Sequence, residues 1–158
     1  MFVLLRHLQR VRRKAGLPRR NGARSLAIRH IDAGSCNACE HELAATAAPQ
    51  YDLQRFGLDV VASPRHADVL LVTGPVTTRM ADPLRAAYEA MPEPRLVAAL
   101  GDCALGCRML GATTELAGPL DALLPVDIRI PGCPPSPEAI ADAILAATGP
   151  GATSRGIG

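Results

Sequence analysis

Two short apolar runs constrain the fold of this chain more than any other feature of its sequence. They read VLLVTG, from residue 69, and RLVAALG, from residue 95. A strand that is buried on both faces of a parallel sheet has this composition, whereas a strand with one solvated face alternates apolar and polar residues. The chain is therefore expected to contain a parallel sheet that is covered on both sides by helices.

Strand-like and helix-like segments alternate along the rest of the chain. The expected strands are Leu26–Ile31, Leu58–Ala62, Val69–Thr73, Leu96–Leu100 and Val126–Ile130. The expected helices are Glu40–Ala48, Asp82–Met91 and Pro137–Ala147. Ser136 is a typical N-cap for the last helix, and Pro137 suits its first position. This alternation predicts a doubly wound α/β domain with right-handed crossovers.

Length and composition fit a single domain of this kind. The chain has 158 residues, and its hydrophobic fraction of 48% includes no tryptophan, so the core must be aliphatic. No apolar run approaches the roughly 20 residues that span a bilayer. We expect an α/β domain over residues 25–148, preceded by a basic arm (residues 1–24) and followed by a disordered tail (residues 149–158).

The basic arm carries eight of the 17 basic residues and no acidic residue, so the remaining chain is acidic. In a helix, its apolar residues would share one face, and four of its cations would share the other: Leu4, Leu5, Leu8 and Val11 against Arg6, Arg10, Arg13 and Lys14. This pattern predicts an interfacial helix that docks on a membrane subunit or on lipid headgroups. A frayed tail is the alternative. A secretory signal is disfavoured because arginines interrupt the apolar stretch, and nucleic-acid binding is disfavoured by the few aromatic residues.

Four cysteines follow the ends of predicted strands. Cys36 and Cys39 form a C-x2-C pair after the first strand, Cys103 follows the fourth, and Cys133 follows the fifth. Loops that leave the carboxyl ends of parallel strands converge on one edge of the sheet, where ligands bind. Because four thiolates at one edge can hold a metal, we expect a metal site there.

The identity of the metal has two candidates. Zinc also accepts four thiolates, but zinc folds usually carry two local C-x2-C pairs. One such pair and two lone cysteines suit an iron–sulfur cubane better, because a cluster spreads its ligands over a wider span. Gly34, Gly101 and Gly132 stand just before the ligands, where they would permit tight turns and let backbone N–H groups approach the sulfurs. Taken singly, each is better explained as an ordinary glycine in a turn. The start of the first predicted helix is expected to favour the Cys39 thiolate.

The remaining reactive side chains have simpler expected roles. Cys107 is expected to be buried rather than to replace Cys103 as a ligand, because Cys103 lies nearer the strand end. His30, His41 and His66 are expected to pack or to cap turns. A flavin site is disfavoured because GSCNAC lacks the Ser, Thr and Gly of a phosphate loop. No Ser-His-Asp or paired-carboxylate pattern is visible, so the isolated chain is expected to be catalytically inert.

Four sequence blocks resemble one known family. They read HIDAGSCNACEHE, SPRHADVLLVTGPVT, LVAALGDCA and LPVDIRIPGCPPSPEAI, in this order between residues 25 and 147. Together they are similar to the B subunit of respiratory complex I and to the small subunits of membrane-bound [NiFe] hydrogenases. The C-x2-C pair resembles the branch of formate hydrogenlyase, because complex I members have two adjacent cysteines at that position.

The resemblance implies a flavodoxin-like fold with one [4Fe–4S] cluster on Cys36, Cys39, Cys103 and Cys133. It also implies electron transfer between a ferredoxin-like iron–sulfur subunit and a large catalytic subunit, in a peripheral complex on the cytoplasmic side of the membrane. Glu42 matches an acidic position of hydrogenase relatives, and a solvated helix carboxylate is its alternative role. The chain departs from the family where Cys107-Arg108 replaces a Gly-Gly pair. The competing hypothesis is a zinc-stabilised interaction subunit without a redox role.

Overall fold

The computed structural model describes residues 25–106 and 114–148. A parallel sheet of five strands forms its centre, in the order β2-β1-β3-β5-β7. The strands are β1 (Leu26–Asp32), β2 (Leu58–Val60), β3 (Val69–Thr73), β5 (Leu96–Leu100) and β7 (Ile128–Ile130). If only these five strands are numbered along the chain, their order in the sheet is 2-1-3-4-5. This is the strand order of flavodoxin-like folds, so the expected fold class is confirmed. The basic arm, the predicted tail and Cys107 lie outside the described residues.

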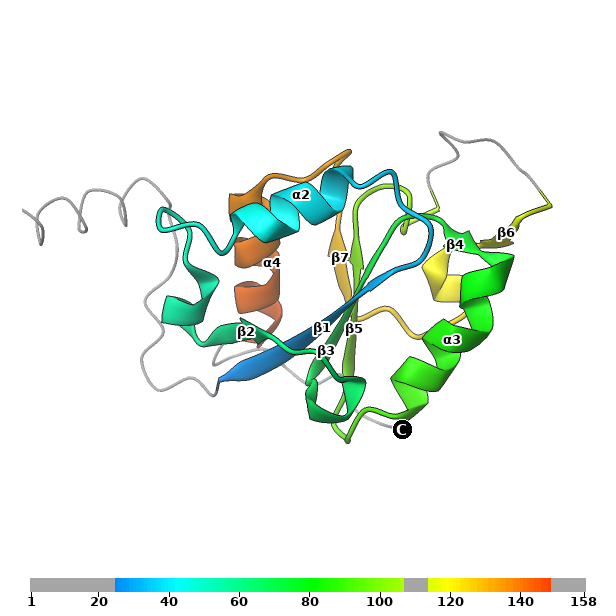
Figure 1. Cartoon of the computed structure of the whole chain (residues 1–158), viewed down its shortest axis with the longest axis horizontal. Coiled ribbons are helices and arrows are strands. Elements are labelled where there is room, and N and C mark those ends of the chain that lie inside the picture. Colours follow the sequence, from blue (N-terminus) through cyan, green and yellow to red (C-terminus); the bar gives the residue numbers. More distant parts are fainter. Residues whose placement is uncertain (1–24, 107–113, 149–158) are drawn as a thin grey trace, which may run out of the picture.

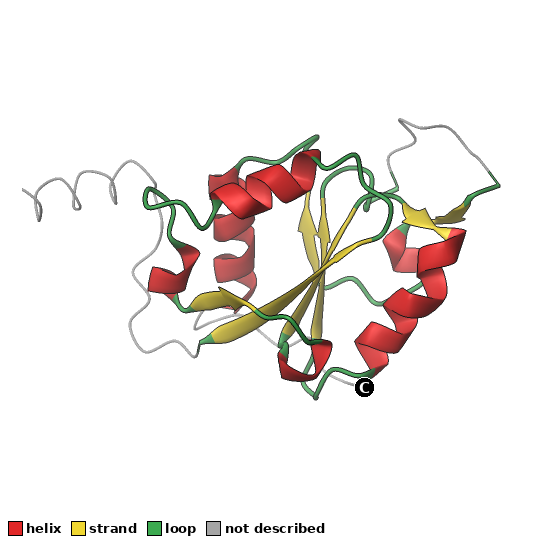
Figure 2. Ribbon diagram, viewed as in Figure 1, coloured by secondary structure: helices red, strands yellow, loops and turns green. Residues whose placement is uncertain are grey.

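Helices cover both faces of the sheet, as Figures 1 and 2 show. One face carries α2 (Ala38–Ala45) and α4 (Pro137–Thr148), and the opposite face carries α3 (Thr78–Glu89). Short 3-10 turns complete the connections: η1 (Leu53–Phe56), η2 (Pro64–His66) and η3 (Leu120–Ala122). A small antiparallel pair, β4 (Val76–Thr77) and β6 (Leu116–Gly118), lies beside α3. None of the helices in the described ranges has the length and hydropathy that a bilayer crossing requires.

The core has two halves because the central strands are buried on both sides. In β3 every residue is buried, and neighbouring side chains point to opposite faces. Val69 and Leu71 pack in the cluster that includes residues of α2 and α4, whereas Leu70 and Val72 pack in the cluster under α3. The near-continuous apolar run therefore reflects burial on both faces, as the sequence predicted.

Several element boundaries differ from those expected, most clearly the starts of α2, α3 and β7. Helix α3 begins at Thr78 rather than at Asp82, and it contains Pro83 in its interior. The strand β4 leads directly into this helix, so Thr77 rather than the residues around the proline marks its start. Helix α2 begins at Ala38, which places Cys39 inside its first turn.

The last strand is shorter than expected because the side chain of Asp127, rather than a backbone carbonyl, accepts the hydrogen bond from β5 at its start. The carboxylate of Asp127 accepts a hydrogen bond from the N–H of Val97 (2.8 Å), and the N–H of Asp127 donates to the Val97 carbonyl (2.9 Å). The regular strand β7 begins one residue later. The pair β4–β6 was not expected, since two or three residues carry too little periodicity to be recognised as a strand.

Candidate cysteine site

The four predicted cysteines follow strand ends on the carboxyl edge of the sheet. Cys36 lies in the loop after β1, and Cys39 lies in the first turn of α2. Cys103 and Cys133 lie in the loops after β5 and β7. Cys36 and Cys133 are exposed, whereas Cys39 and Cys103 are half-buried. The strand β3 lies between β1 and β5 in the sheet, and it ends at Thr73 rather than leading to a cysteine at this edge.

Cys39 fits against the end of β5 only because residue 101 has no side chain. A Cβ atom at Gly101 would lie 2.6 Å from the Cys39 Sγ, which is far inside van der Waals contact. The φ angle of Gly101 is 88°, in the left-handed region that residues with a side chain rarely adopt. Gly101 therefore provides both the turn that leaves β5 and the space for the sulfur.

Two hydrogen bonds join the loop of Cys103 to the loop of Cys133. The Asp102 carboxylate accepts from the N–H of Gly132 (2.7 Å), and the N–H of Asp102 donates to the Gly132 carbonyl (2.9 Å). Each of these residues directly precedes a cysteine in the sequence. The pair therefore fixes the two lone cysteines relative to each other.

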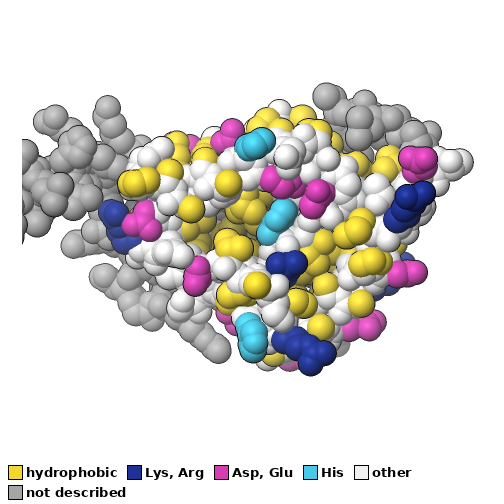
Figure 3. Space-filling view, in the orientation of Figure 1, with side chains coloured by type: hydrophobic (Ala, Val, Ile, Leu, Met, Phe, Trp, Pro, Cys, Tyr) yellow, Lys and Arg dark blue, Asp and Glu magenta, His cyan; other side chains and the backbone are white. Residues whose placement is uncertain are grey.

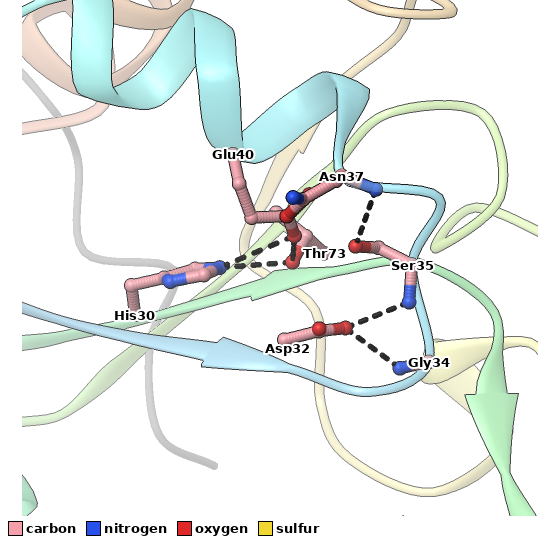
Figure 4. Close-up of polar contacts among 7 residues, drawn as sticks. All are labelled: His30, Asp32, Gly34, Ser35, Asn37, Glu40 and Thr73. Carbon is pink, nitrogen blue, oxygen red and sulfur yellow. Dashed lines mark hydrogen bonds and ion pairs between the residues drawn. The ribbon is translucent and has the colours of Figure 1, made fainter.

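The loop that carries the C-x2-C pair is held by a carboxylate at the end of β1 (Figure 4). Asp32 accepts hydrogen bonds from the N–H groups of Gly34 (2.8 Å) and Ser35 (2.7 Å). The Ser35 hydroxyl in turn accepts from the N–H of Asn37 (3.1 Å), the residue that precedes α2. Burial alone would raise the pKa of Asp32, but these backbone hydrogen bonds outweigh it and lower the pKa, so the ionised form is favoured.

The three glycines before the predicted ligands use their own N–H groups to close turns. Gly34 donates to Asp32, Gly101 donates to the Ile130 carbonyl (2.8 Å), and Gly132 donates to Asp102. Each of these N–H groups therefore helps to hold its loop together, and the approach of backbone N–H groups to the sulfurs stays a prediction. The contribution of these glycines is conformation and space.

The electrostatic environment of Cys39 is negative. Burial raises the pKa of its thiol to about 11, and Glu40, followed by Cys103, Cys36 and Cys133, adds to this shift. The expected stabilisation of a Cys39 thiolate by the helix start was therefore wrong, because burial and the adjacent carboxylate act in the opposite direction. The same shift identifies the other three cysteines as neighbours that interact with Cys39. In the described ranges, no three His, Cys, Asp or Glu side chains form a group that could hold a metal ion.

A polar trio that the sequence did not predict lies beside Cys39. His30 from β1, Thr73 from β3 and Glu40 from α2 point toward one another (Figure 4). The Thr73 hydroxyl donates a short hydrogen bond to Glu40 Oε1, and the His30 Nε2 lies 2.8 Å from the Thr73 Oγ1. His30 Nε2 and Glu40 Oε1 are 3.6 Å apart, which is too far for a direct hydrogen bond. Figure 3 shows histidine and acidic side chains together among apolar surface near the middle of one face.

The charge states within the trio follow from its burial. Burial lowers the pKa of His30 from its ordinary value of 6.5, and the nearby carboxylates of Glu40 and Asp32 offset only part of this effect. Burial would raise the pKa of Glu40, but hydrogen bonding, above all from Thr73, lowers it overall. At neutral pH the contact is therefore a hydrogen-bond chain from a neutral imidazole to a carboxylate, rather than an ion pair.

A sequence signal for this trio existed. His30 and Asp32 are polar residues two positions apart, so they share a face of β1 directly before the first cysteine. His30 was expected to pack or to cap a turn, but its ring nitrogen is part of the trio. By contrast, His41 and His66 are exposed, and Glu42 is half-buried on α2.

Comparisons with known proteins converge on one group. The family described as NADH ubiquinone oxidoreductase, 20 Kd subunit, matches residues 36–147, a range that includes all four predicted ligands. A probable membrane-bound hydrogenase subunit of Pyrococcus furiosus, mbhJ, is 45% identical over 124 residues, which are 78% of this chain and 74% of that protein. Formate hydrogenlyase subunit 7 of Escherichia coli is 43% identical over 116 residues, which are 73% of this chain and 46% of that protein.

A solved structure also resembles the chain. It is described as the membrane-bound sulfane sulfur reductase (MBS), an archaeal respiratory membrane complex. One of its chains superimposes with a TM-score of 0.68 at 34% sequence identity, over 78% of this chain and 68% of that chain.

Proposed function

Because the chain belongs to the NADH ubiquinone oxidoreductase 20 Kd subunit family, we propose that it is the electron-transfer small subunit of a membrane-associated oxidoreductase. In this proposal Cys36, Cys39, Cys103 and Cys133 bind one [4Fe–4S] cluster. The relatives named as hydrogenase and formate hydrogenlyase subunits support a complex of the group that contains [NiFe] hydrogenases and complex I.

The observation that carries the proposal is the position of the four cysteines. They lie in the segments that follow the carboxyl ends of three strands of one parallel sheet, and Cys103, Cys36 and Cys133 act electrostatically on Cys39. A thiol whose pKa is raised to about 11 stays protonated at neutral pH unless a positive centre stabilises its thiolate. Cysteine thiolates are the usual ligands of a [4Fe–4S] cluster, so four cysteines from one edge of the sheet are a donor set of the right chemistry.

The residues around the cysteines have a positioning task in this function. A bound cluster accepts and donates single electrons. The Asp102–Gly132 pair would hold the two lone ligands in register, and Asp32 would hold the loop of the C-x2-C pair. Such fixed loops limit the movement of the ligands when the charge of the cluster changes.

The proposed partners are a large subunit with the catalytic site, a ferredoxin-like iron–sulfur subunit and membrane subunits. The exposed edge with Cys36 and Cys133 suits contact with redox partners, because electrons must pass from one centre to the next over short distances. We place the complex on the cytoplasmic side of the membrane as a peripheral assembly, with the basic arm as its attachment. The chain is then one subunit of an oxidoreductase, and by itself it is expected to be inert.

Iron and sulfide analysis tests the proposal directly. The full-length chain, purified without oxygen, should contain about four irons and about four acid-labile sulfides and should absorb broadly in the visible range. Replacing Cys36, Cys39, Cys103 or Cys133 by serine should abolish or strongly reduce both contents. Cys107→Ser is the matched control and should retain the cluster.

Two outcomes would contradict the proposal. Stoichiometric zinc without sulfide would identify the chain as a zinc-stabilised interaction subunit. A cluster that survives Cys103→Ser but not Cys107→Ser would leave the function intact and would show that the ligand assignment is wrong.

A further inference from the structure

We propose that Thr73 is a positioning residue that holds the charge of Glu40 beside Cys39 and thereby lowers the reduction potential of the cluster. This inference rests on the proposed function, because it concerns the same cluster. Thr73 does not approach the cluster as a ligand in this proposal. It acts through the carboxylate that follows Cys39 in the sequence.

The hydrogen-bond directions in the polar trio are determined by the Thr73 hydroxyl. This hydroxyl has one proton, and it donates that proton to Glu40 Oε1. The His30 Nε2 at 2.8 Å must therefore be the donor to the Thr73 oxygen, which requires the imidazole tautomer with the proton on Nε2. The result is a directed chain from β1 through β3 to the first turn of α2.

Burial makes this chain difficult to replace by water. The Thr73 side chain is fully buried, and the side chains of His30 and Glu40 are 22% and 17% exposed. The second oxygen of Glu40, Oε2, is also buried and has no hydrogen-bond partner among the described residues. A buried carboxylate with one unsatisfied oxygen would otherwise turn toward water, and the hydrogen bond from Thr73 opposes this more than those from Ser35 and from the Glu40 N–H do.

The retained carboxylate lies close enough to the cysteine site to affect it. Glu40 directly follows Cys39 in α2, and the hydrogen bond from Thr73 holds its carboxylate at the carboxyl end of β3, the strand that lies between β1 and β5. Reduction adds one negative charge to a cluster, and a fixed negative charge nearby makes that addition less favourable. Glu40 should therefore shift the reduction potential to more negative values, and the shift should depend on the Thr73 hydroxyl.

Redox titration of the full-length, cluster-loaded chain, followed by electron paramagnetic resonance, tests this inference. Glu40→Gln keeps the shape and removes the charge, so it should raise the reduction potential. Thr73→Val keeps the volume and removes the hydroxyl, so it should raise the potential in the same direction. Thr73→Ser retains a hydroxyl and should stay at the wild-type potential.

A matched control excludes a general effect of net charge. Glu93 lies before β5, at the opposite edge of the sheet, and its side chain is 70% exposed. Glu93→Gln should leave the potential unchanged. If Thr73→Val does not accumulate, Thr73→Ala removes the same hydroxyl without placing a second methyl group near Glu40.

Two results would overturn the inference while the cluster is present. One is a wild-type potential in Glu40→Gln, and the other is equal potentials in Thr73→Ser and the variants without the hydroxyl. If the wild-type chain contains no iron and sulfide, it is the proposed function that fails, so the two failures are distinguishable.

Discussion

At the scale of single residues, the cysteine site depends on side chains that are small or that bond to the backbone. Gly101 leaves space for a sulfur, Asp32 and Asp102 close two loops, and Thr73 retains a carboxylate. None of these residues is a predicted ligand. Their effect is on where the ligands lie, which makes them testable by small substitutions.

Gly101→Ala should displace Cys39 and cause loss of iron. The added Cβ would lie 2.6 Å from the Sγ, and the φ angle of 88° would add backbone strain of about 1–3 kcal/mol. Gly118→Ala is the matched control, because its φ of 113° is similarly strained but no atom lies within 4 Å of the new Cβ. Iron content and urea unfolding of both variants measure the difference. Equal iron loss in the two variants would show that strain, rather than the sulfur contact, is responsible.

His30 should make the stability of the fold depend on pH. Its pKa in the folded chain is lower than the ordinary value of 6.5, so the unfolded chain binds a proton first as the pH falls. The free energy of unfolding is therefore expected to decrease below about pH 6.5, until the folded chain also binds the proton. Above about pH 6.5 both states are neutral at this position, and no dependence is expected from it.

Urea unfolding of wild type and His30→Gln at several pH values measures this dependence. As the pH is lowered from about 7.5 to about 5.5, the free energy of unfolding of the wild type should decrease more than that of His30→Gln. His66→Gln, at an exposed position, is the control. A constant difference between wild type and His30→Gln would contradict the prediction.

At the scale of elements, the effect of local sequence on structure is clearest at the first residues of helix α4. Ser136 accepts a hydrogen bond from the N–H of Ala139 (3.3 Å), and Pro137 occupies the first position of α4. The sequence predicted both features. Helix α4 buries Ile140 and Ile144 against one face of the sheet. A stable helix start therefore supports the packing of that face.

Ser136→Ala should reduce the free energy of unfolding by about 1 kcal/mol, because the N–H of Ala139 loses its acceptor. Ser63→Ala serves as the comparison, since Ser63 caps only the three residues of η2 through a longer contact of 3.4 Å. Chemical denaturation of both variants gives the two values. An effect of Ser63→Ala as large as that of Ser136→Ala would contradict the assignment of Ser136 as the more important cap.

At the scale of the whole molecule, the chain combines an acidic domain with a basic segment outside the described residues. Residues 1–24 carry eight cations, and four of their apolar residues would share one face of a helix. Each cation near an anionic membrane surface contributes about 1 kcal/mol, so the arm can add substantially to membrane attachment. The four cysteines of the proposed site lie after this segment in the sequence, so we expect cluster binding not to require it.

Deletion of residues 2–24 should therefore separate the two properties. The truncated chain is expected to keep its iron, sulfide and visible spectrum, and to be released from membranes or from its assembly. Membrane fractionation at increasing salt, together with iron analysis, measures both. Equal membrane yield and salt resistance for the truncated and full-length chains would exclude an anchoring role of the arm.

The sequence by itself determined the central sheet, the order of its elements and the four cysteines at strand ends. The boundaries of β3 and β5 agree residue for residue with the prediction, because a strand buried on both faces must be apolar throughout. Cysteines after such strands could be assigned to one edge, because topology brings the carboxyl ends of parallel strands together. These features depend on local pattern and chain order, which the sequence carries directly.

The tertiary structure decided what surrounds the cysteines. The contact of Cys39 with Gly101 joins residues 62 positions apart, and the trio of His30, Thr73 and Glu40 joins two strands and a helix. The raised pKa of the Cys39 thiol likewise comes from burial and from neighbouring charges, which outweigh the local effect of a helix start. Periodicity reports only which face a residue occupies, so distances and charges across strands had to come from the packed fold.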